Sequence, residues 1–197
     1  MDPKDKIHEA AFRLFTGVGY SGVTMDRIAR DCGMGKATLY KYFPSKEALL
    51  LSCVDYFSAK IGAEVEQVVA NPTLSTRQKV TGFVVPVVQF VSRVSSDVLG
   101  DIQRNVPEAY QKIEENRKKI ILSNIVRIIR EGKESGVFRR DVDGVLVAHI
   151  LIGAISHLST PQILEELGLP TGQLFNSVLS VLWEGCLSEQ GRAGESF

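Results

Sequence analysis

Hydrophobic residues recur at helical spacing along almost the whole chain, and alternating strand patterns are nearly absent. Apolar positions at i, i+3, i+4 and i+7 mark one buried face of an α-helix. Proline and glycine fall mainly between these periodic stretches, where helices begin and end. The pattern predicts an all-α protein in two parts, a three-helix head over residues 1–50 and a helical body over residues 51–197.

The first two helices of the predicted head each carry one apolar face. In the first helix this face consists of Ala10, Ala11, Leu14 and Phe15. The second helix begins after Thr24, whose hydroxyl can cap the free amides of a helix start. Its apolar face consists of Met25, Ile28, Ala29 and Cys32. Tyr20, between the two helices, either reaches a bound phosphate or closes the core of the head.

A glycine turn separates the second helix from the third. Gly33 stands where a helix end needs positive φ, and Gly35 follows two positions later. Such a short turn joins two helices at a steep angle. The third helix, residues 36–43, is therefore expected to project outward, where it can contact a partner. Leu39 and Phe43 are spaced to pack inward. The outward side chains are Lys36, Ala37, Thr38, Tyr40, Lys41 and Tyr42.

These outward side chains suit a polyanion. Lysines neutralise phosphates, hydroxyl groups hydrogen-bond to phosphate oxygens, and the small Ala37 allows close approach to base edges. Pro44 then ends the helix, and Ser45 caps the next one, whose first turn carries Lys46. Short helical hairpins also occur as core elements, so the combination of cap, glycines, Pro-Ser stop and lysines, rather than any one piece, favours DNA recognition.

Residues 7–51 closely resemble the N-terminal signature of the TetR family of bacterial transcriptional repressors. The matching pieces are GYSGVTM at residues 19–25, the Ile28-Ala29 pair and GKATLYKYFPSKEALL at residues 35–50. The resemblance implies that the six outward residues of the third helix line the major groove or its phosphates. It also implies that Thr24 and Lys46 touch the DNA backbone, that a dimer reads an inverted-repeat operator, and that the body holds a small-molecule effector.

The body is predicted to continue as helices. They span residues 45–69, 75–95, 97–104, 107 to the glycines at 132–136, 145–159 and 171–187, with a turn or short helix at 161–168. Pro86 lies inside one of them and predicts a kink or a broken helix. The tail, residues 188–197, is expected to fray.

The last two long helices are apolar on more than one face. A symmetric four-helix dimer interface explains this, as the family resemblance also implies, and a purely intramolecular core is the alternative. The expected interface residues are Ile150, Gly153, Ala154, His157, Phe175, Val178, Leu182 and Trp183.

An effector pocket inside the body is implied by the resemblance. Few charges fall on the inner faces of the helices, so an apolar or aromatic effector is expected. The candidate lining residues are Phe57, Phe83, Val87, Phe90, Val91, Ile121, Ile125 and His149. An apolar stripe at helical spacing is more often part of an ordinary core.

Charge and composition agree with this interpretation without proving it. Residues 1–50 carry eight Lys or Arg against six Asp or Glu, and the remainder carries fifteen against seventeen. Three cysteines without paired spacing predict reduced, buried thiols and a cytoplasmic protein. No cleavable leader and no apolar stretch of about 18 residues is found, so neither export nor membrane insertion is expected.

Enzyme and metal-site patterns are absent from the sequence. It contains no G-x-S-x-G elbow, Walker-type loop or H-E-x-x-H run, so neither an enzyme nor a cofactor is expected. His149 and His157 lie about 12 Å apart along a helix and cannot share one metal ion. The sequence predicts a ligand-responsive transcriptional regulator; the remaining alternative is a helical ligand-binding or adaptor protein that keeps the head but does not read DNA.

Overall fold

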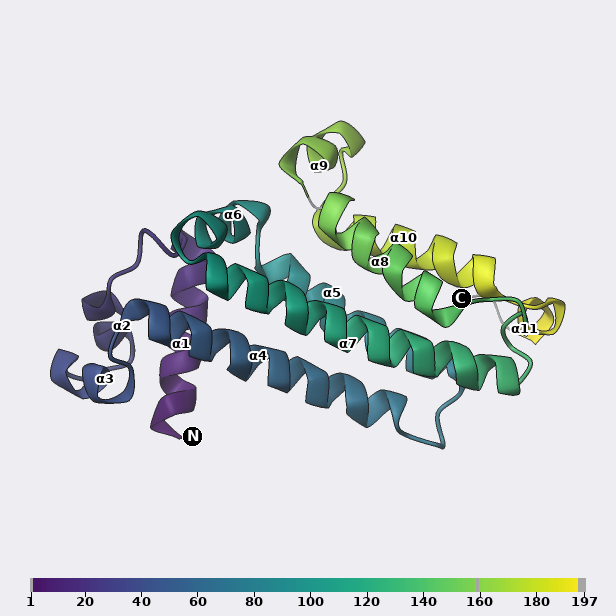
Figure 1. Cartoon of the computed structure of the whole chain (residues 1–197), viewed down its shortest axis with the longest axis horizontal. Helices are drawn as coiled ribbons and strands as arrows, with labels where there is room; N and C mark the ends of the chain where they lie inside the picture. Colours follow the sequence, from purple (N-terminus) through teal and green to yellow (C-terminus); the bar gives the residue numbers. More distant parts are fainter. Residues whose placement is uncertain (1, 159, 195–197) are drawn as a thin grey trace. The chain divides into compact units, whose positions relative to one another are not determined.

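The computed structural model describes residues 2–158 and 160–194. Within them the regular elements are helices, together with one isolated antiparallel bridge between Phe138 and Leu187 (Figure 1). The all-α prediction is confirmed. The helices are α1 Pro3–Val18, α2 Met25–Asp31, α3 Lys36–Tyr42, α4 Lys46–Val69, α5 Thr76–Arg93, α6 Ser96–Asn105, α7 Pro107–Glu134, α8 Gly144–Leu158, α9 Pro161–Leu167, α10 Thr171–Cys186 and α11 Glu189–Gly194.

The chain forms two compact units. The head unit comprises Met1–Lys60 and Arg93–Asn116, and the body unit comprises Ile61–Ser92 and Arg117–Phe197. The division falls inside α4 and α7, so both long helices contribute to each unit. The head unit is larger than the predicted three-helix segment, because the first turns of α4 and the whole of α6 pack with it.

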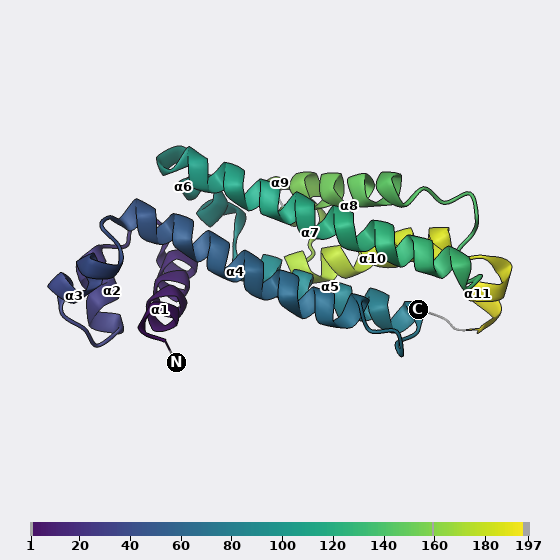
Figure 2. The ribbon, with the colours of Figure 1, turned by 60° about the horizontal axis from the view of Figure 1, so that its bottom comes forward.

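The head unit is built around the apolar faces expected from the sequence. α1, α2 and α3 lie beside the N-terminal end of α4 in both Figures 1 and 2. Ile7, Ile28 and Leu39 have no exposed surface, and full burial of such a side chain stabilises a fold by about 1.5–3 kcal/mol. The predicted apolar faces of the first two helices are all buried.

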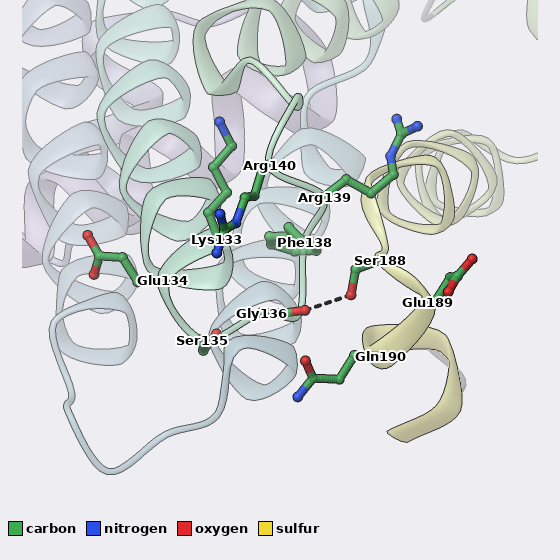
Figure 3. Close-up of a pocket in the computed structure, with 10 residues that line it drawn as sticks. All are labelled: Lys133, Glu134, Ser135, Gly136, Phe138, Arg139, Arg140, Ser188, Glu189 and Gln190. Atoms are coloured by element: carbon green, nitrogen blue, oxygen red, sulfur yellow. Dashed lines mark hydrogen bonds between the residues drawn. The ribbon is translucent and has the colours of Figure 1, made fainter.

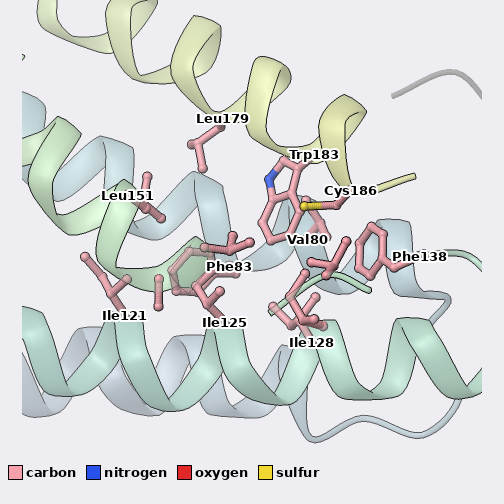
Figure 4. Close-up of a cluster of buried hydrophobic side chains, with 14 of the residues drawn as sticks. Val80, Phe83, Ile121, Ile125, Ile128, Phe138, Leu151, Leu179, Trp183 and Cys186 are labelled. Carbon is pink, nitrogen blue, oxygen red and sulfur yellow. The ribbon is translucent and has the colours of Figure 1, made fainter. Parts of the chain in front are cut away.

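The body unit has its own hydrophobic core, to which α4, α5, α7, α8 and α10 contribute (Figure 4). Trp183 of α10 stacks on Phe138 with ring centroids 5.8 Å apart. Gly132 of α7 makes room for that ring, because a Cβ at this position would lie 2.1 Å from Phe138 Cδ2. The α7–α8 connection is thereby packed into the core.

The prediction of a frayed tail was wrong, and of the kink or break predicted at Pro86 the break is not observed. α5 continues through Pro86, because Val84, Val87 and Val88 on both sides of the proline pack against the core and hold the helix despite the missing N–H. Residues 189–194 form α11 instead of fraying. The hydroxyl of Ser188 accepts from the Gly191 N–H at 2.9 Å and donates to the Gly136 carbonyl at 2.6 Å. Residues 195–197 lie outside the described part.

Cys32, Cys53 and Cys186 are buried and unpaired, as predicted, and burial raises the pKa of each thiol. Among the described residues, no helix combines the length and the apolar character needed to cross a membrane.

Candidate nucleic-acid interface

The start of α2 and the turn after it have the predicted geometry. Thr24 is the extended N-cap, and its Oγ1 accepts from the Arg27 N–H at 3.3 Å. Gly33 has a φ of +65°, and its N–H donates to the Arg30 carbonyl at 3.0 Å. A residue with a side chain would be strained at that φ, so the glycine permits the sharp passage from α2 to α3.

α3 has one buried and one exposed side. Leu39 is fully buried and Phe43, its C-cap, is 6% exposed, whereas Tyr40 and Tyr42 are 40% and 37% exposed. Both tyrosines are thus partly open to solvent, and tyrosine hydroxyls can hydrogen-bond to phosphate oxygens. The exposed residues are Lys36, Ala37, Thr38, Tyr40, Lys41 and Tyr42, the set expected from the sequence.

One ion pair links α3 to α2. Lys36 Nζ lies 2.8 Å from Asp26 Oδ1, and this hydrogen bond raises the pKa of Lys36. Both side chains are largely exposed, and exposed pairs of this kind are weak. A phosphate can therefore displace Asp26 as the partner of the lysine.

Lys46 points into the protein. Its Nζ donates to the carbonyls of Tyr20 and Val23, both at 2.9 Å, and lies 4.1 Å from the centroid of the Tyr20 ring. Tyr20 itself is only 8% exposed, so it closes the core of the head; of the two interpretations left open for it, the core role is the one observed.

Two groups of the head unit were missed from the sequence. Asp101 of α6 accepts hydrogen bonds from Ser21, eighty residues earlier in the chain, and no local pattern signals such a pair. His8 is 6% exposed in α1; its Nε2 lies 2.8 Å from Ser52 Oγ, and its ring stacks on Tyr56. The i, i+4 position of His8 before Phe12 was the available signal that it lies on a packed face.

The predicted effector-pocket residues are distributed over both units. Phe57 belongs to the head unit, where its ring lies 4.2 Å from that of Phe12. Phe83, Ile121 and Ile125 are buried in the body core. Val87 packs against that core and Phe90 is half-buried, while the side chain of Val91 lies outside the described part.

The assignment of His149 to an internal pocket was wrong. His149 is exposed on α8, because Ala148, Leu151 and Ile155 form the buried side of that helix.

Only some of the predicted dimer-interface residues lie at the surface of the single chain. Phe175 and Trp183 are buried in the body core at 2% and 3% exposure, so placing them at an interface was wrong. Both fill the space between α10 and the rest of the body unit. Ile150, Gly153 and His157 are exposed, and Ala154, Val178 and Leu182 are half-buried. Leu146 and Val181, which were not predicted, are 58% and 73% exposed.

A polar hollow of about 540 Å³ lies at the end of the body unit where α7, the α7–α8 connection and α11 meet (Figure 3). Lys133, Arg139 and Arg140 line it together with Glu134 and Glu189, and none of the predicted pocket residues does. Its charged lining does not match an apolar effector.

Comparison with known proteins agrees with this geometry. Residues 7–53 match the family model described as bacterial regulatory proteins, tetR family. The chain is 24% identical over 185 residues to YvaF, an HTH-type transcriptional regulator of Bacillus subtilis, covering 94% of this chain and 96% of YvaF. It is 46% identical over 61 residues to YuxN, an HTH-type transcriptional regulator of the same organism, covering 30% of this chain and 21% of YuxN.

A solved structure has the same fold. The transcriptional regulator FadR from Bacillus subtilis, in complex with stearoyl-CoA, superposes with a TM-score of 0.69 at 23% identity, covering 92% of this chain and 98% of FadR. The family model covers the helix-turn-helix, whose caps, turn and exposed third helix are all in place here. Residues 7–53 of the chain therefore carry the helix-turn-helix of the bacterial regulatory proteins of the tetR family.

Proposed function

We propose that the chain is a ligand-responsive transcriptional repressor that binds a palindromic operator as a dimer. The observation that carries this proposal is the division of α3 into a buried side and an exposed side rich in lysine and hydroxyl groups. Such groups bind phosphates and base edges, and a short helix beyond a glycine turn can enter the major groove. The residues proposed to contact DNA are Thr24, Lys36, Ala37, Thr38, Tyr40, Lys41, Tyr42 and Lys46.

Dimerisation is proposed to occur through α8 and α10. A two-fold operator needs two recognition helices, which a symmetric dimer supplies. Leu146, Ile150 and Val181 are 46–73% exposed in the single chain, and exposed apolar side chains on neighbouring helices favour an interface. Gly153 adds a position with open space where the partner helix can approach closely. Repression, rather than activation, follows from the family resemblance.

The effector is proposed to be apolar or aromatic and to bind in the body. Phe83, Ile121 and Ile125 belong to the apolar core of the body unit. The FadR structure holds stearoyl-CoA, a ligand with a long apolar chain, which supports this class of effector. An effector that binds better to a second arrangement of the body would shift the dimer towards it, and recognition helices at a changed spacing would no longer match the operator.

Selection from a random DNA pool at near-physiological salt, followed by sequencing, tests the proposal. The purified full-length protein should enrich an inverted repeat. Tyr42→Ala should weaken binding to that repeat by about 1–3 kcal/mol through loss of a DNA contact. Tyr110→Ala, which removes a tyrosine of α7 outside the recognition helix, is the matched control and should bind as the parent does. If no sequence is enriched, DNA reading fails and the adaptor alternative takes its place.

A further inference from the structure

Trp183 carries a hydrogen-bond donor that the core of the body unit leaves without a partner. The side chain is 3% exposed, and among the described residues no acceptor lies within hydrogen-bond distance of its Nε1. Two further buried residues of the body unit have polar side chains, and both are bonded. Lys79 is paired with Glu131, and Asn124 Nδ2 donates to the Ile120 carbonyl at 2.8 Å. The indole N–H differs from them and therefore needs a physical explanation.

Packing alone does not explain this donor. A buried N–H loses its hydrogen bond to water on folding and recovers the loss only when an acceptor reaches it. The ring of Trp183 stacks on Phe138 with 5.8 Å between the centroids, and this contact does not use the N–H. The donor is thus available to a molecule that enters the core.

The N–H faces the interior of the body core. In Figure 4, Nε1 lies at the edge of the indole ring that points towards Leu179, whereas Phe138 lies on the other side of the ring. Phe83 of α5 and Leu151 of α8 also stand on the Leu179 side (Figure 4), and all three side chains are buried. An acceptor atom brought between these side chains would reach the N–H.

The surroundings of the N–H select the kind of acceptor. The side chains of the body core cluster are apolar except for this indole and the thiol of Cys186, and none of them is charged. A buried carboxylate or phosphate would therefore have no charged partner within the cluster, and burying an unpaired charge costs far more than burying a neutral carbonyl. A neutral oxygen acceptor, as in a ketone, an ester or an ether, needs only one donor, which the indole supplies.

We infer that Trp183 is a specificity-determining residue of the effector site, and that the effector is an apolar molecule with a neutral oxygen acceptor to which Nε1 donates. This inference rests on the proposed function and narrows the class of effector named there. The N–H is unbonded in the free chain and bonded in the complex, so the new hydrogen bond favours the effector-bound arrangement of the body. A wholly apolar ligand of the same shape gains nothing from the indole.

A single NMR signal reports on this donor, because Trp183 is the only tryptophan of the chain. Nitrogen-15 labelling of the full-length protein therefore gives one indole N–H signal. Acetophenone, an aromatic ketone, should move the indole proton downfield by hydrogen bonding. α-Methylstyrene, in which a methylene group replaces the carbonyl oxygen, should not cause this downfield shift, and neither should benzoate.

Two outcomes of the NMR measurement would contradict the inference. A ketone that causes no larger downfield shift than the hydrocarbon would overturn the role of Nε1. A benzoate shift as large as that of the ketone would overturn the neutral class of effector. The measurement uses the parent protein, so its result does not depend on whether a variant folds.

Trp183→Phe removes the N–H and keeps an aromatic ring. Calorimetry gives the affinity ratio of acetophenone to α-methylstyrene, and comparing this ratio between two proteins cancels the different hydrophobicity of the two ligands. The ratio should be about tenfold lower in Trp183→Phe than in the parent, because one hydrogen bond is lost. An equal ratio in the two proteins would overturn the inference.

Phe138→Leu is the matched control, because it changes the packing of the same indole ring and retains the N–H. This variant should keep the affinity ratio of the parent. A similar tenfold fall in Phe138→Leu would assign the effect to packing and would overturn the role of the hydrogen bond.

Failure of this inference and failure of the proposed function give different results. If α-methylstyrene binds and the ketone has no advantage that depends on Trp183, the apolar effector remains and the hydrogen bond is refuted. If neither ligand binds, both the inference and the proposed class of effector fail. Selection from the random DNA pool still decides, in either case, whether the protein reads DNA.

Discussion

The head unit and the body unit differ in how clearly the sequence of each helix indicates which of its sides is buried. In the head, α1, α2 and α3 each carry one apolar face and one polar face, and every residue predicted on an apolar face is buried. In the body, α8 is apolar around most of its circumference, and α10 has a broad apolar face. There Trp183 and Phe175, expected at the dimer interface, are buried in the core, and His149, expected inside, is exposed.

This difference shows what hydrophobic periodicity can decide. A helix with a single apolar face has only one way to bury it, so its pattern predicts both the helix and its orientation. A helix that is apolar on several sides can turn any of them towards the core, and its neighbours make the choice. The identity to YuxN is 46% over 61 residues, whereas the identity to YvaF over 185 residues is 24%.

The largest expected effect comes from removing the buried tryptophan of α10. Trp183→Ala should lower the free energy of unfolding by about 3–5 kcal/mol, because it empties the space against Phe138. Urea unfolding followed by circular dichroism measures the change. Asn176→Ala at an exposed position of the same helix is the control and should leave the stability of the fold nearly unchanged. Equal effects of the two substitutions would contradict the observed orientation of α10.

A charge on the exposed side of α8 should separate dimer formation from folding. Ile150 is 46% exposed in the single chain, so Ile150→Glu should fold normally. At a desolvated interface the unpaired carboxylate should weaken the dimer by about 3 kcal/mol. Light scattering across a concentration series measures this. Arg140→Glu, an exposed charge reversal in the α7–α8 connection, is the control, and a fully dimeric Ile150→Glu would place the interface elsewhere.

A smaller, pH-dependent effect is expected from the head. Burial lowers the pKa of His8 below its ordinary value, and the Asp5 carboxylate offsets only part of this. In the unfolded chain the imidazole takes up a proton below pH of about 6.5, while in the folded head it resists protonation until the pH reaches its lower pKa. The contribution of His8 to the stability of the head should therefore be constant above a pH of about 6.5. It should decrease as the pH falls from there towards the folded pKa, by at most about 1.4 kcal/mol per pH unit.

NMR signals of residues 7–53 in the full-length protein, followed through urea titrations at neutral and mildly acidic pH, measure this fall. His8→Gln should reduce it. His157→Gln changes an exposed histidine of the body unit and should not alter the pH dependence of the head. A head as stable at acidic as at neutral pH would contradict the burial of a neutral imidazole.

The sequence by itself determined the all-α class, the order of the long helices, the caps at Thr24 and Gly33, and the two sides of α3. Each of these features depends on contacts between residues that are close in the chain, so the spacing of apolar, capping and glycine residues is enough to predict it. Only the tertiary structure decided that α5 continues through Pro86 and that Ser188 caps α11, because distant neighbours outweigh local propensity at both places. It likewise decided which side of α10 is buried, and it joined Asp101 to Ser21 across eighty residues.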